Sequence, residues 1–509
     1  MKKNCLLVIL VIVVSSISVY AQLPTEDPPE GKLHPMLKDV IEAGPYTAQW
    51  ESLVKHPIPE WFVDNKIGLS AHWGPYAVPG WTPRKDTPYG VAYAEWYWFW
   101  MRDKKPVQEH HKKHYGDAKY DDFINGTRNL VTGKKEGFFA ENFDADKWMQ
   151  TFKNAGAKYF FITSKHHDGF CIWDTKYTNR NSKKMGPKRD LYGELVKAAR
   201  KHGIKIGIYY SYYEWNNPIY LRKGEISDYK GCKKLKDEDN DGLLNEYVDD
   251  FMVPQIKELI DKYHPDYICF DGEWDHGYVY WRSRQILAYY YNQAVARGQE
   301  VIINDRFGYN KENLSNTRGV YGDFRHVEYH AKIDRSKPWA MWRGFGNSFG
   351  YNKNEHPNNI LQPKQVIEMI IDCVSQNGNI EFNIGPKADG TISEIDMDRL
   401  SAMGKWLKVN GEAIYNTKAI KPHRDKSIRF TQKDDALYAI YLANDNETAP
   451  PAKIYITNIQ PKNGAEVHML GVIEKLTWQK SGNGFIVEIP EFVQKNPPCK
   501  YAWTVKISK

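Results

Sequence analysis

The stretch KYFFIT (158–163), LYGELVKAARKH (191–202), Gly203 and IKIGIYY (204–210) decides the fold. The first and last runs are short and apolar, which is typical of buried strands. The middle run ends before Gly203, a common helix terminator. It carries apolar residues at helical spacing, namely Leu191, Leu195, Ala198 and Ala199. A strand, a helix and a second strand in this order predict two parallel strands joined by a crossover helix.

The same order recurs further along the chain. Residues 247–263 and 281–297 have helical patterns, and apolar runs follow them at 267–270 and 301–303. Over more than 300 residues, the economical arrangement is a closed (β/α)8-like barrel of the TIM type, which we expect over residues 50–420. An open doubly wound sheet is the alternative, but no GxGxxG motif follows a strand to favour it.

The two ends of the chain differ from this pattern. Residues 1–21 begin with Lys2 and Lys3 and continue in an apolar run, which predicts a signal peptide and export to the periplasm or the medium. Residues 22–49 are expected to form an N-terminal arm. Residues 421–509 contain short alternating segments separated by turns, which predict a C-terminal β-sandwich domain. No later run is long and apolar enough to predict a membrane span.

Composition excludes some function classes. Removal of Lys2 and Lys3 takes the formal charge from +7 to +5, and no basic cluster tracks phosphates, so nucleic acid is not an expected partner. Asp237, Asp239 and Asp241 resemble the start of a calcium loop, but its twelfth position is Val248 rather than glutamate. The cysteines are scattered without zinc spacing. We therefore expect no metal.

Polar residues follow five of the expected strands, where barrel enzymes build their active sites. These are HWG (72–74), KHHDG (165–169), Ser211 with Glu214 and Trp215, DGEW (271–274), and NDR (304–306). Asp271 comes directly after an apolar strand, a suitable position for a rigidly held nucleophile. Retaining cleavage of a glycosidic bond needs a second carboxyl group about 5–5.5 Å away. Spacing alone leaves four candidates open: Glu95, Glu214, Glu273 and Glu328.

His166 and His167 are adjacent, so in an extended segment they would point in opposite directions. Such a pair chelates a metal poorly compared with histidines one helical turn apart. Hydrogen bonding to sugar hydroxyls is the favoured interpretation, and core packing is the alternative.

Taken together, these motifs resemble those of one known protein family. The chain resembles glycoside hydrolase family 29, the retaining α-L-fucosidases, from about Trp50 to Tyr415 and loosely beyond. The motifs that carry the resemblance occur in the family's order: GLSAHWGPYAVP (68–79), EWY (95–97), KHHDGF (165–170), GPKRDL (186–191), GIYYS (207–211), NDR (304–306), SFGYN (348–352), NIGP (383–386) and KWLKVNGEAIY (405–415).

The resemblance implies roles for individual residues. Asp271 is implied to be the nucleophile. Contact with fucose is implied for His72, Glu95, Trp96, His166, His167 and Tyr209, and the pocket lining for Arg306 and Phe349. Family members place the general acid/base differently. One pattern, an EY pair after DF, matches Glu328, and the other, a WE pair, meets Trp339-Ala340 here, so we expect Glu328 to serve.

The resemblance implies an exo-acting retaining hydrolase that releases terminal α-L-fucose by double displacement. Its expected partner is a fucosylated oligosaccharide or polysaccharide, with or without sulfate groups. The resemblance implies no organic cofactor. Two alternatives stay open: a non-catalytic fucose-binding protein, motivated by Ala340, and an α-L-galactosidase of the same fold, because the two sugars differ by one hydroxyl at C6.

Overall fold

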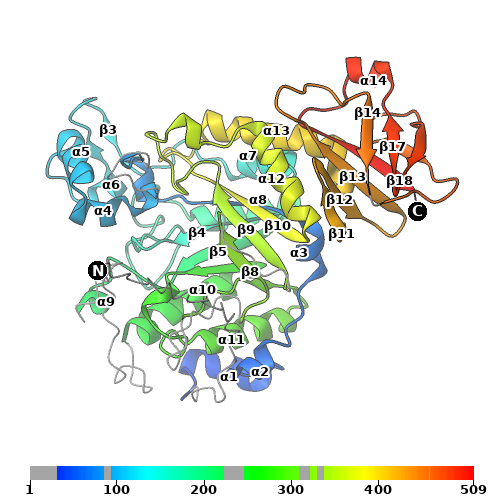
Figure 1. Ribbon diagram of the computed structural model, residues 1–509. Helices are drawn as coiled ribbons and strands as arrows, with labels where there is room; N and C mark the ends of the chain where they lie inside the picture. The colour runs from blue at the N-terminus through cyan, green and yellow to red at the C-terminus, as the bar shows by residue number, and fades with distance from the viewer. Residues whose placement is uncertain are drawn as a thin grey trace, which may run out of the picture.

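The structure, a computed structural model, describes residues 31–84, 93–222, 246–308, 321–329, 337–457 and 459–508. The expected signal peptide (1–21) and the acidic segment from Asp237 to Asp241 lie outside the described residues. Two bodies are visible, a large α/β domain and a smaller β domain that lies against its helices α12 and α13 (Figure 1).

Eight parallel strands form one curled sheet in the α/β domain. They are β1 (Ile67–Ala71), β4 (Tyr159–Lys165), β5 (Lys205–Ser211), β6 (Tyr267–Asp271), β7 (Ile302–Ile303), β8 (Arg325–Glu328), β9 (Trp339–Gly344) and β10 (Gly378–Ile384). Their order is β7-β6-β5-β4-β1-β10-β9-β8. This is the order of a barrel, with β7 and β8 at its two free edges.

Side chains join those two edges among the described residues. Ile303 N–H donates to the carboxylate of Asp323 at 2.9 Å, and Asp323 N–H donates back to the Ile303 carbonyl at 3.3 Å. One step along, His326 N–H donates to Asp305 Oδ1 at 3.2 Å. The prediction of a (β/α)8-like barrel is therefore confirmed, with the difference that its last seam is bridged by carboxylates instead of a ladder of strand bonds.

Helices on the outside connect the strands. They are α7 (Ala145–Asn154), α8 (Leu191–His202), α9 (Pro218–Arg222), the π-helix η4 (Val248–Met252), α10 (Val253–Tyr263), α11 (Ser283–Ala296), α12 (Pro363–Ser375) and α13 (Glu394–Asn410). The stretch that opened the sequence analysis is β4, α8 and β5, with Phe160 opposite Ile206 in a parallel ladder. Gly203 caps α8 in the left-handed conformation, at φ +71°.

Before β1 and between β1 and β4, the chain adds shorter elements. These are α1 (Pro35–Ala43), α2 (Trp50–Leu53), α3 (Glu60–Asn65), η1 (Pro75–Ala77), η2 (Ala94–Trp96), α4 (Tyr97–Asp103), α5 (Lys105–Tyr115), α6 (Asp122–Asn125) and the hairpin β2 (Thr127–Arg128)–β3 (Lys135–Glu136); η5 (Glu273–Asp275), η6 (Pro357–Asn359) and η7 (Gly411–Ala413) occur later. Helix α1 lies in the expected arm and packs on α11 through Leu37 and Ile41.

The C-terminal domain contains two antiparallel sheets. One has the order β11 (Lys418–Asp425), β12 (Ile428–Gln432), β13 (Ala436–Leu442), β18 (Ala502–Ser508), β15 (Val467–Met469), and the other β14 (Lys453–Ile456), β17 (Gly484–Glu488), β16 (Trp478–Ser481); α14 (Glu491–Lys495) precedes β18. A shared apolar core that includes Phe430, Phe485 and Trp503 lies between them. The predicted β-sandwich is confirmed.

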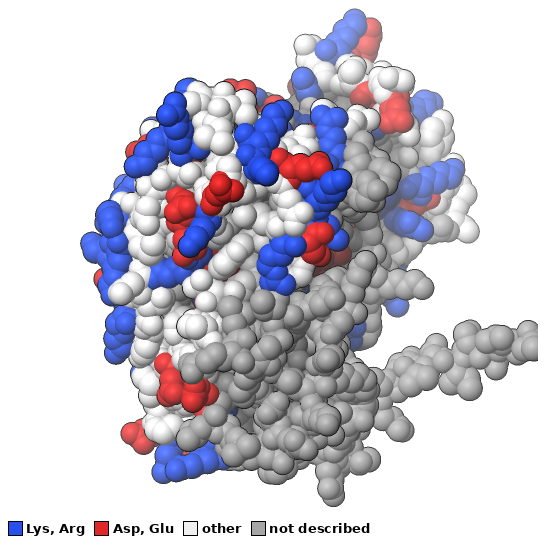
Figure 2. Space-filling view, turned by 90° about the vertical axis from the view of Figure 1, so that its left-hand side faces the viewer, with Lys and Arg blue, Asp and Glu red and all other residues white. Residues whose placement is uncertain are grey.

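On the face shown in Figure 2, lysine and arginine side chains alternate with acidic ones and do not form a continuous basic stripe. Among the described residues, no helix is both long enough and apolar enough to cross a bilayer.

Candidate active site

Asp271 is the last residue of β6 and is 8% exposed. Tyr209, on the neighbouring strand β5, donates its hydroxyl to Asp271 Oδ2 at 2.7 Å. Arg306, three residues beyond β7, donates Nη1 to Asp271 Oδ1. Both oxygens of the carboxylate are thus held from different strands, so the group is rigid at the carboxyl edge of the barrel, where the sequence predicted it.

Arg306 also donates Nη2 to Glu328, the last residue of β8. One planar guanidinium therefore carries both carboxylates. Burial disfavours the charge of Arg306, but the Glu328 and Asp271 carboxylates outweigh that cost and raise the pKa of the guanidinium above its ordinary value. The Glu328 side chain is 29% exposed against 11% for Asp271, so Glu328 lies nearer the solvent side of the pair.

Three buried histidines surround this pair. Burial lowers the pKa of His72 and of His167 to about 4, and it lowers the pKa of His166 well below the ordinary value. The histidines also disfavour each other's charge, since the rings of His72 and His166 are 5.4 Å apart and those of His166 and His167 are 4.2 Å apart. All three are therefore neutral near pH 7, and each can donate one hydrogen bond and accept another.

Their partners determine which ring nitrogens face the site. His72 Nδ1 is 2.8 Å from Asn383 Oδ1, an acceptor, so Nδ1 carries the proton. His167 Nδ1 is 2.6 Å from the Ser211 hydroxyl, which already donates to the Tyr213 carbonyl. Nε2 of each ring is then an acceptor for a hydroxyl group. In His167, Nε2 is 3.8 Å from Asp271 Oδ2. His166 Nδ1 is buried without a hydrogen-bond partner among the described residues.

Glu95, on η2, is buried against the segment 348–350. Gly350 N–H donates to Glu95 Oε2 at 2.8 Å, and the Ser348 hydroxyl donates to the same oxygen at 3.2 Å. Burial raises the pKa of Glu95 to about 7. Glu95 therefore fixes both neighbours of Phe349.

Aromatic rings form two walls. On one side, Phe349 lies 4.9 Å from His72 and 4.6 Å from Trp342, between ring centroids. On the other, Trp96 and Trp215 lie 5.2 and 5.3 Å from the His167 ring. The wall of Phe349 and Trp342 is also held by a polar bond, because the Trp342 indole N–H donates to the Ser70 hydroxyl at 2.7 Å.

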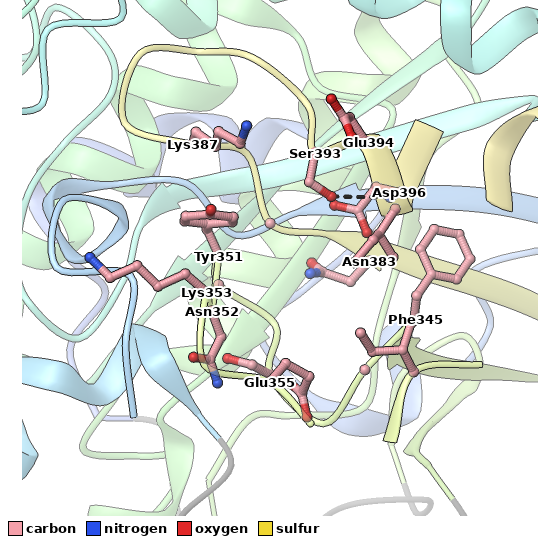
Figure 3. Close-up of a pocket in the computed structure, with 16 residues that line it drawn as sticks. Phe345, Tyr351, Asn352, Lys353, Glu355, Asn383, Lys387, Ser393, Glu394 and Asp396 are labelled. Carbon is pink, nitrogen blue, oxygen red and sulfur yellow. Dashed lines mark hydrogen bonds between the residues drawn. The ribbon is translucent and has the colours of Figure 1, made fainter. Parts of the chain in front are cut away.

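A cavity of about 420 Å³ lies between the segment after β9, including Ser348 and Gly350, and the start of α13 (Figure 3). Its polar lining is largely used internally. Asn383 accepts from Ser70 and His72 and donates to the Phe349 and Ile384 carbonyls. Ser393 caps α13 by accepting from Asp396 N–H. Through Asn383, the lining of the cavity thus supports the segment that carries Phe349.

The structure brings together all ten residues that the sequence analysis assigned to the site. Two of the other candidate acids differ from Glu328 in their surroundings. Glu214 is paired with Lys165 at 2.8 Å in a buried ion pair, and Glu273 is 0% exposed. Sequence reasoning gave no role to Trp342, Asn383 or Ser211. Asn383 and Ser211 lie in quoted motifs at strand ends, which was an available signal, whereas Trp342 lies inside β9 and resembles any core tryptophan.

Comparisons with known proteins agree with this geometry. A family model described as Alpha-L-fucosidase matches residues 36–412, and one described as Alpha-L-fucosidase C-terminal domain matches residues 421–508. Tissue alpha-L-fucosidase of Bos taurus is 35% identical over 473 residues, which cover 91% of each protein.

Solved structures are similar over most of the chain. The Thermotoga maritima alpha-fucosidase in complex with a mechanism-based inhibitor is 33% identical, with a TM-score of 0.71 over 90% of this chain and 99% of that one. A Bacteroides thetaiotaomicron GH29 alpha-L-fucosidase, trapped as a covalent intermediate with 2-fluoro-fucosyl fluoride, is 26% identical, with a TM-score of 0.65 over 88% and 95%. Two family models, relatives along the whole chain and a shared fold lead to one conclusion: the chain belongs to the α-L-fucosidases of glycoside hydrolase family 29, which are glycosidases that hydrolyse fucosides.

Proposed function

We propose that this enzyme releases terminal α-L-fucose with retention of configuration, by double displacement. The observation that carries the proposal is the pairing of Asp271 and Glu328 through the single guanidinium of Arg306. The guanidinium holds the two carboxyl groups close together at the strand ends. Retaining glycosidases require a close pair of this kind, about 5–5.5 Å apart. The T. maritima and B. thetaiotaomicron relatives, solved with a mechanism-based inhibitor and as a trapped covalent intermediate, support the same chemistry.

In the first step, a carboxylate oxygen of Asp271 bonds to C1 of the fucose while the C1–O bond to the leaving group breaks. The protonated carboxyl of Glu328 gives its proton to the departing oxygen. In the second step, Glu328 takes a proton from water, the water oxygen bonds to C1, and the bond to Asp271 breaks. Tyr209 and Arg306 orient Asp271 from two sides throughout.

Glu328 is a better acid/base candidate than the alternative position of the family. Ala340 is 0% exposed, and its side chain packs in the barrel interior with Trp342 and Phe161. Ala340 is the second residue of β9, at the amino end of the strand, whereas Asp271 and Glu328 each end a strand at the carboxyl edge. The absence of a glutamate at Ala340 therefore does not weaken the case for catalysis.

The neutral histidines, Glu95 and Trp96 are proposed to bind the fucose hydroxyls and ring, in an exo-acting site on a fucosylated glycan. The apolar wall of Phe349 and Trp342 suits the C6 methyl group, the feature that distinguishes fucose from L-galactose. We also propose that the chain is exported, on the basis of residues 1–21.

The test measures kcat/KM on aryl α-L-fucosides for the wild type, Asp271→Ala and Glu328→Ala, with the exposed Glu394→Gln as a control. We expect Asp271→Ala to lose turnover, and Glu328→Ala to lose about 10²–10⁴-fold on poor leaving groups and to recover with azide on activated ones. A 2-fluoro-fucosyl inactivator should label the peptide that contains Asp271. Undiminished turnover by Asp271→Ala would overturn the proposal. Fucose binding without turnover by the wild type would favour a non-catalytic binding protein. Faster cleavage of α-L-galactosides than of α-L-fucosides would favour a galactosidase.

A further inference from the structure

The seam between β7 and β8 is the weakest joint of the barrel, and both ends of the catalytic pair depend on it. Arg306 follows β7, and Glu328 ends β8. Among the described residues, these two strands share no ladder, while β8 pairs with β9 from Arg325 to Glu328. The position of Glu328 relative to Arg306 therefore depends on the few bonds that cross the seam.

Asp323 makes two of those bonds. Its carboxylate Oδ2 accepts from Ile303 N–H at 2.9 Å, and its own N–H donates to the Ile303 carbonyl at 3.3 Å. The two bonds form a closed ring that substitutes for a strand bridge. The third bond, from His326 N–H to Asp305, lies one step nearer the active site. Asp323 thus aligns the start of β8 with the strand that carries Arg306.

The other oxygen of Asp323 is clamped from outside the barrel. His56 Nδ1 and the Tyr291 hydroxyl each lie 3.0 Å from Oδ1. The rings of His56 and Tyr291 stack at 3.7 Å with an angle of 3° between their planes. One comes from the segment after α2 and the other from α11, so two separate elements hold the carboxylate at a fixed place. The Asp323 side chain is 4% exposed, so water does not replace these partners readily.

The described segments outside the seam pack around this clamp. The described residues between β7 and β8, 304–308 and 321–324, contain no helix. The N-terminal segment of Trp50 to Ile58 covers the seam instead, and leaves a cavity of about 190 Å³ beside Asp323. Within this packing, the buried carboxylate of Asp323 joins the start of β8 to β7 by hydrogen bonds.

We propose that Asp323 is a positioning residue for acid/base catalysis: through the seam it sets where Glu328 stands relative to Arg306 and the leaving group. The inference rests on the proposed role of Glu328. Asp323 is not one of the residues proposed to bind the sugar. The strand that ends at Asp271, β6, pairs fully with β5 from Gly207–Tyr267 to Ser211–Asp271, and Arg306 adds a direct bond to Asp271. Loss of Asp323 should therefore impair proton transfer and spare the nucleophile.

The chain provides a matched control. Asp266 makes the same ring between β5 and β6, with its carboxylate accepting from Ile206 N–H at 3.0 Å and its N–H donating to the Ile206 carbonyl at 2.7 Å. It precedes β6, whose alignment with β5 is already fixed by a ladder. Asp266→Ala removes an equivalent local motif without freeing a catalytic strand.

The experiment compares kcat/KM for phenyl and 2,4-dinitrophenyl α-L-fucosides, because only the phenyl leaving group needs full protonation. We expect Asp323→Ala to lose about 10-fold or more on the phenyl substrate and less than about 3-fold on the dinitrophenyl one. Its rate of inactivation by a 2-fluoro-fucosyl fluoride should match the wild type. Asp323→Asn keeps one oxygen for His56 or Ile303, so its loss on the phenyl substrate should lie between those of the wild type and Asp323→Ala. Asp266→Ala should lose equally little on both substrates.

Glu328→Gln, measured in parallel, distinguishes a failure of the proposed acid/base role of Glu328 from a failure of the proposed role of Asp323. If Glu328→Gln shows no dependence on the leaving group, the proposed acid/base assignment itself fails. If it shows that dependence while Asp323→Ala and Asp323→Asn lose activity equally on both substrates, only the role of Asp323 is wrong. Thermal melting of each variant identifies any that does not fold. If Asp323→Ala is one of these, the Asp323→Asn ratio decides the question.

Discussion

Tyr209 and Tyr210 are neighbours on β5 whose hydroxyl groups lie on opposite faces of the strand. Tyr209 donates to Asp271 at 2.7 Å, whereas Tyr210 donates to Gln255 at 2.8 Å, on the helix side. A hydrogen bond to a charged group contributes about 1.5–3 kcal/mol. We expect Tyr209→Phe to lower kcat about 10–100-fold, and Tyr210→Phe to leave it unchanged, in steady-state assays on an aryl fucoside. Equal effects of the two substitutions would contradict the role given to the Tyr209 hydroxyl.

Glu95 gives the protein a pH-dependent stability. Burial raises the pKa of Glu95 from 4.5 to about 7, and that of Asp168 from 3.8 to about 6. Below pH 4.5 the Glu95 carboxyl is protonated in both the folded and the unfolded protein. Between pH 4.5 and 7 the folded protein keeps a proton that the unfolded chain releases, so the free energy of unfolding falls as the pH rises.

Replacement by glutamine removes that titration while it keeps a neutral side chain of similar shape. We expect the melting temperature of Glu95→Gln, relative to the wild type, to rise between pH 4.5 and pH 7.5 in calorimetry. Glu394 is an exposed carboxyl, so the melting temperature of Glu394→Gln should match that of the wild type at both pH values. A difference between Glu95→Gln and wild type that does not change with pH would refute the assignment.

Individual residues also show how far sequence reasoning reaches into the site. Asp271 follows an apolar run, so its place at the carboxyl edge was predictable from strand pattern alone. Glu328 was not, because spacing left four acids open and only the resemblance selected it. In the structure, the two acids differ in their partners: Arg306, which also binds Asp271, holds Glu328, whereas Lys165 pairs with Glu214. Contacts between residues far apart in sequence carry no local signal.

At the scale of elements, the unit β4–α8–β5 matches its prediction to within two residues at each end. Its apolar spacing and its terminating glycine act within the segment, so sequence reveals them. The seam between β7 and β8 was beyond such reasoning. Ile302–Ile303 is only two residues long, and its closure with Asp323 depends on His56, which is 267 positions away from Asp323.

Gly203 provides a test at this scale. It ends α8 at φ +71°, and no atom lies within 4 Å of an added Cβ, so the cost of a side chain comes from the backbone conformation alone. We expect Gly203→Ala to lower the free energy of unfolding by about 1 kcal/mol, and Gly203→Asn to cost less, because asparagine tolerates the left-handed region. Denaturant unfolding measures both, and kcat should not change. A larger loss for asparagine than for alanine would exclude this explanation.

For the whole molecule, the question is whether the barrel and the sandwich unfold together. Trp406 on α13 is 2% exposed and donates its indole N–H to the Ala502 carbonyl of β18 at 3.0 Å. Asn410, one turn later, accepts from the Thr504 hydroxyl at 2.7 Å. The barrel core continues through this contact into Tyr438 and Ile440 of β13. The sandwich therefore covers apolar surface that the barrel would otherwise expose to water.

Truncation of Trp406 should destabilise both domains at once. We expect Trp406→Ala to lower the free energy of unfolding by about 3–5 kcal/mol and to shift one cooperative calorimetric transition. Trp406→Phe should cost less, because it keeps most of the ring and loses only the bond to Ala502. Turnover per folded molecule should stay at the wild-type value, since α13 carries no residue of the proposed site. Two wild-type transitions, of which the substitution moves only one, would mean that the sandwich is attached without stabilising the barrel.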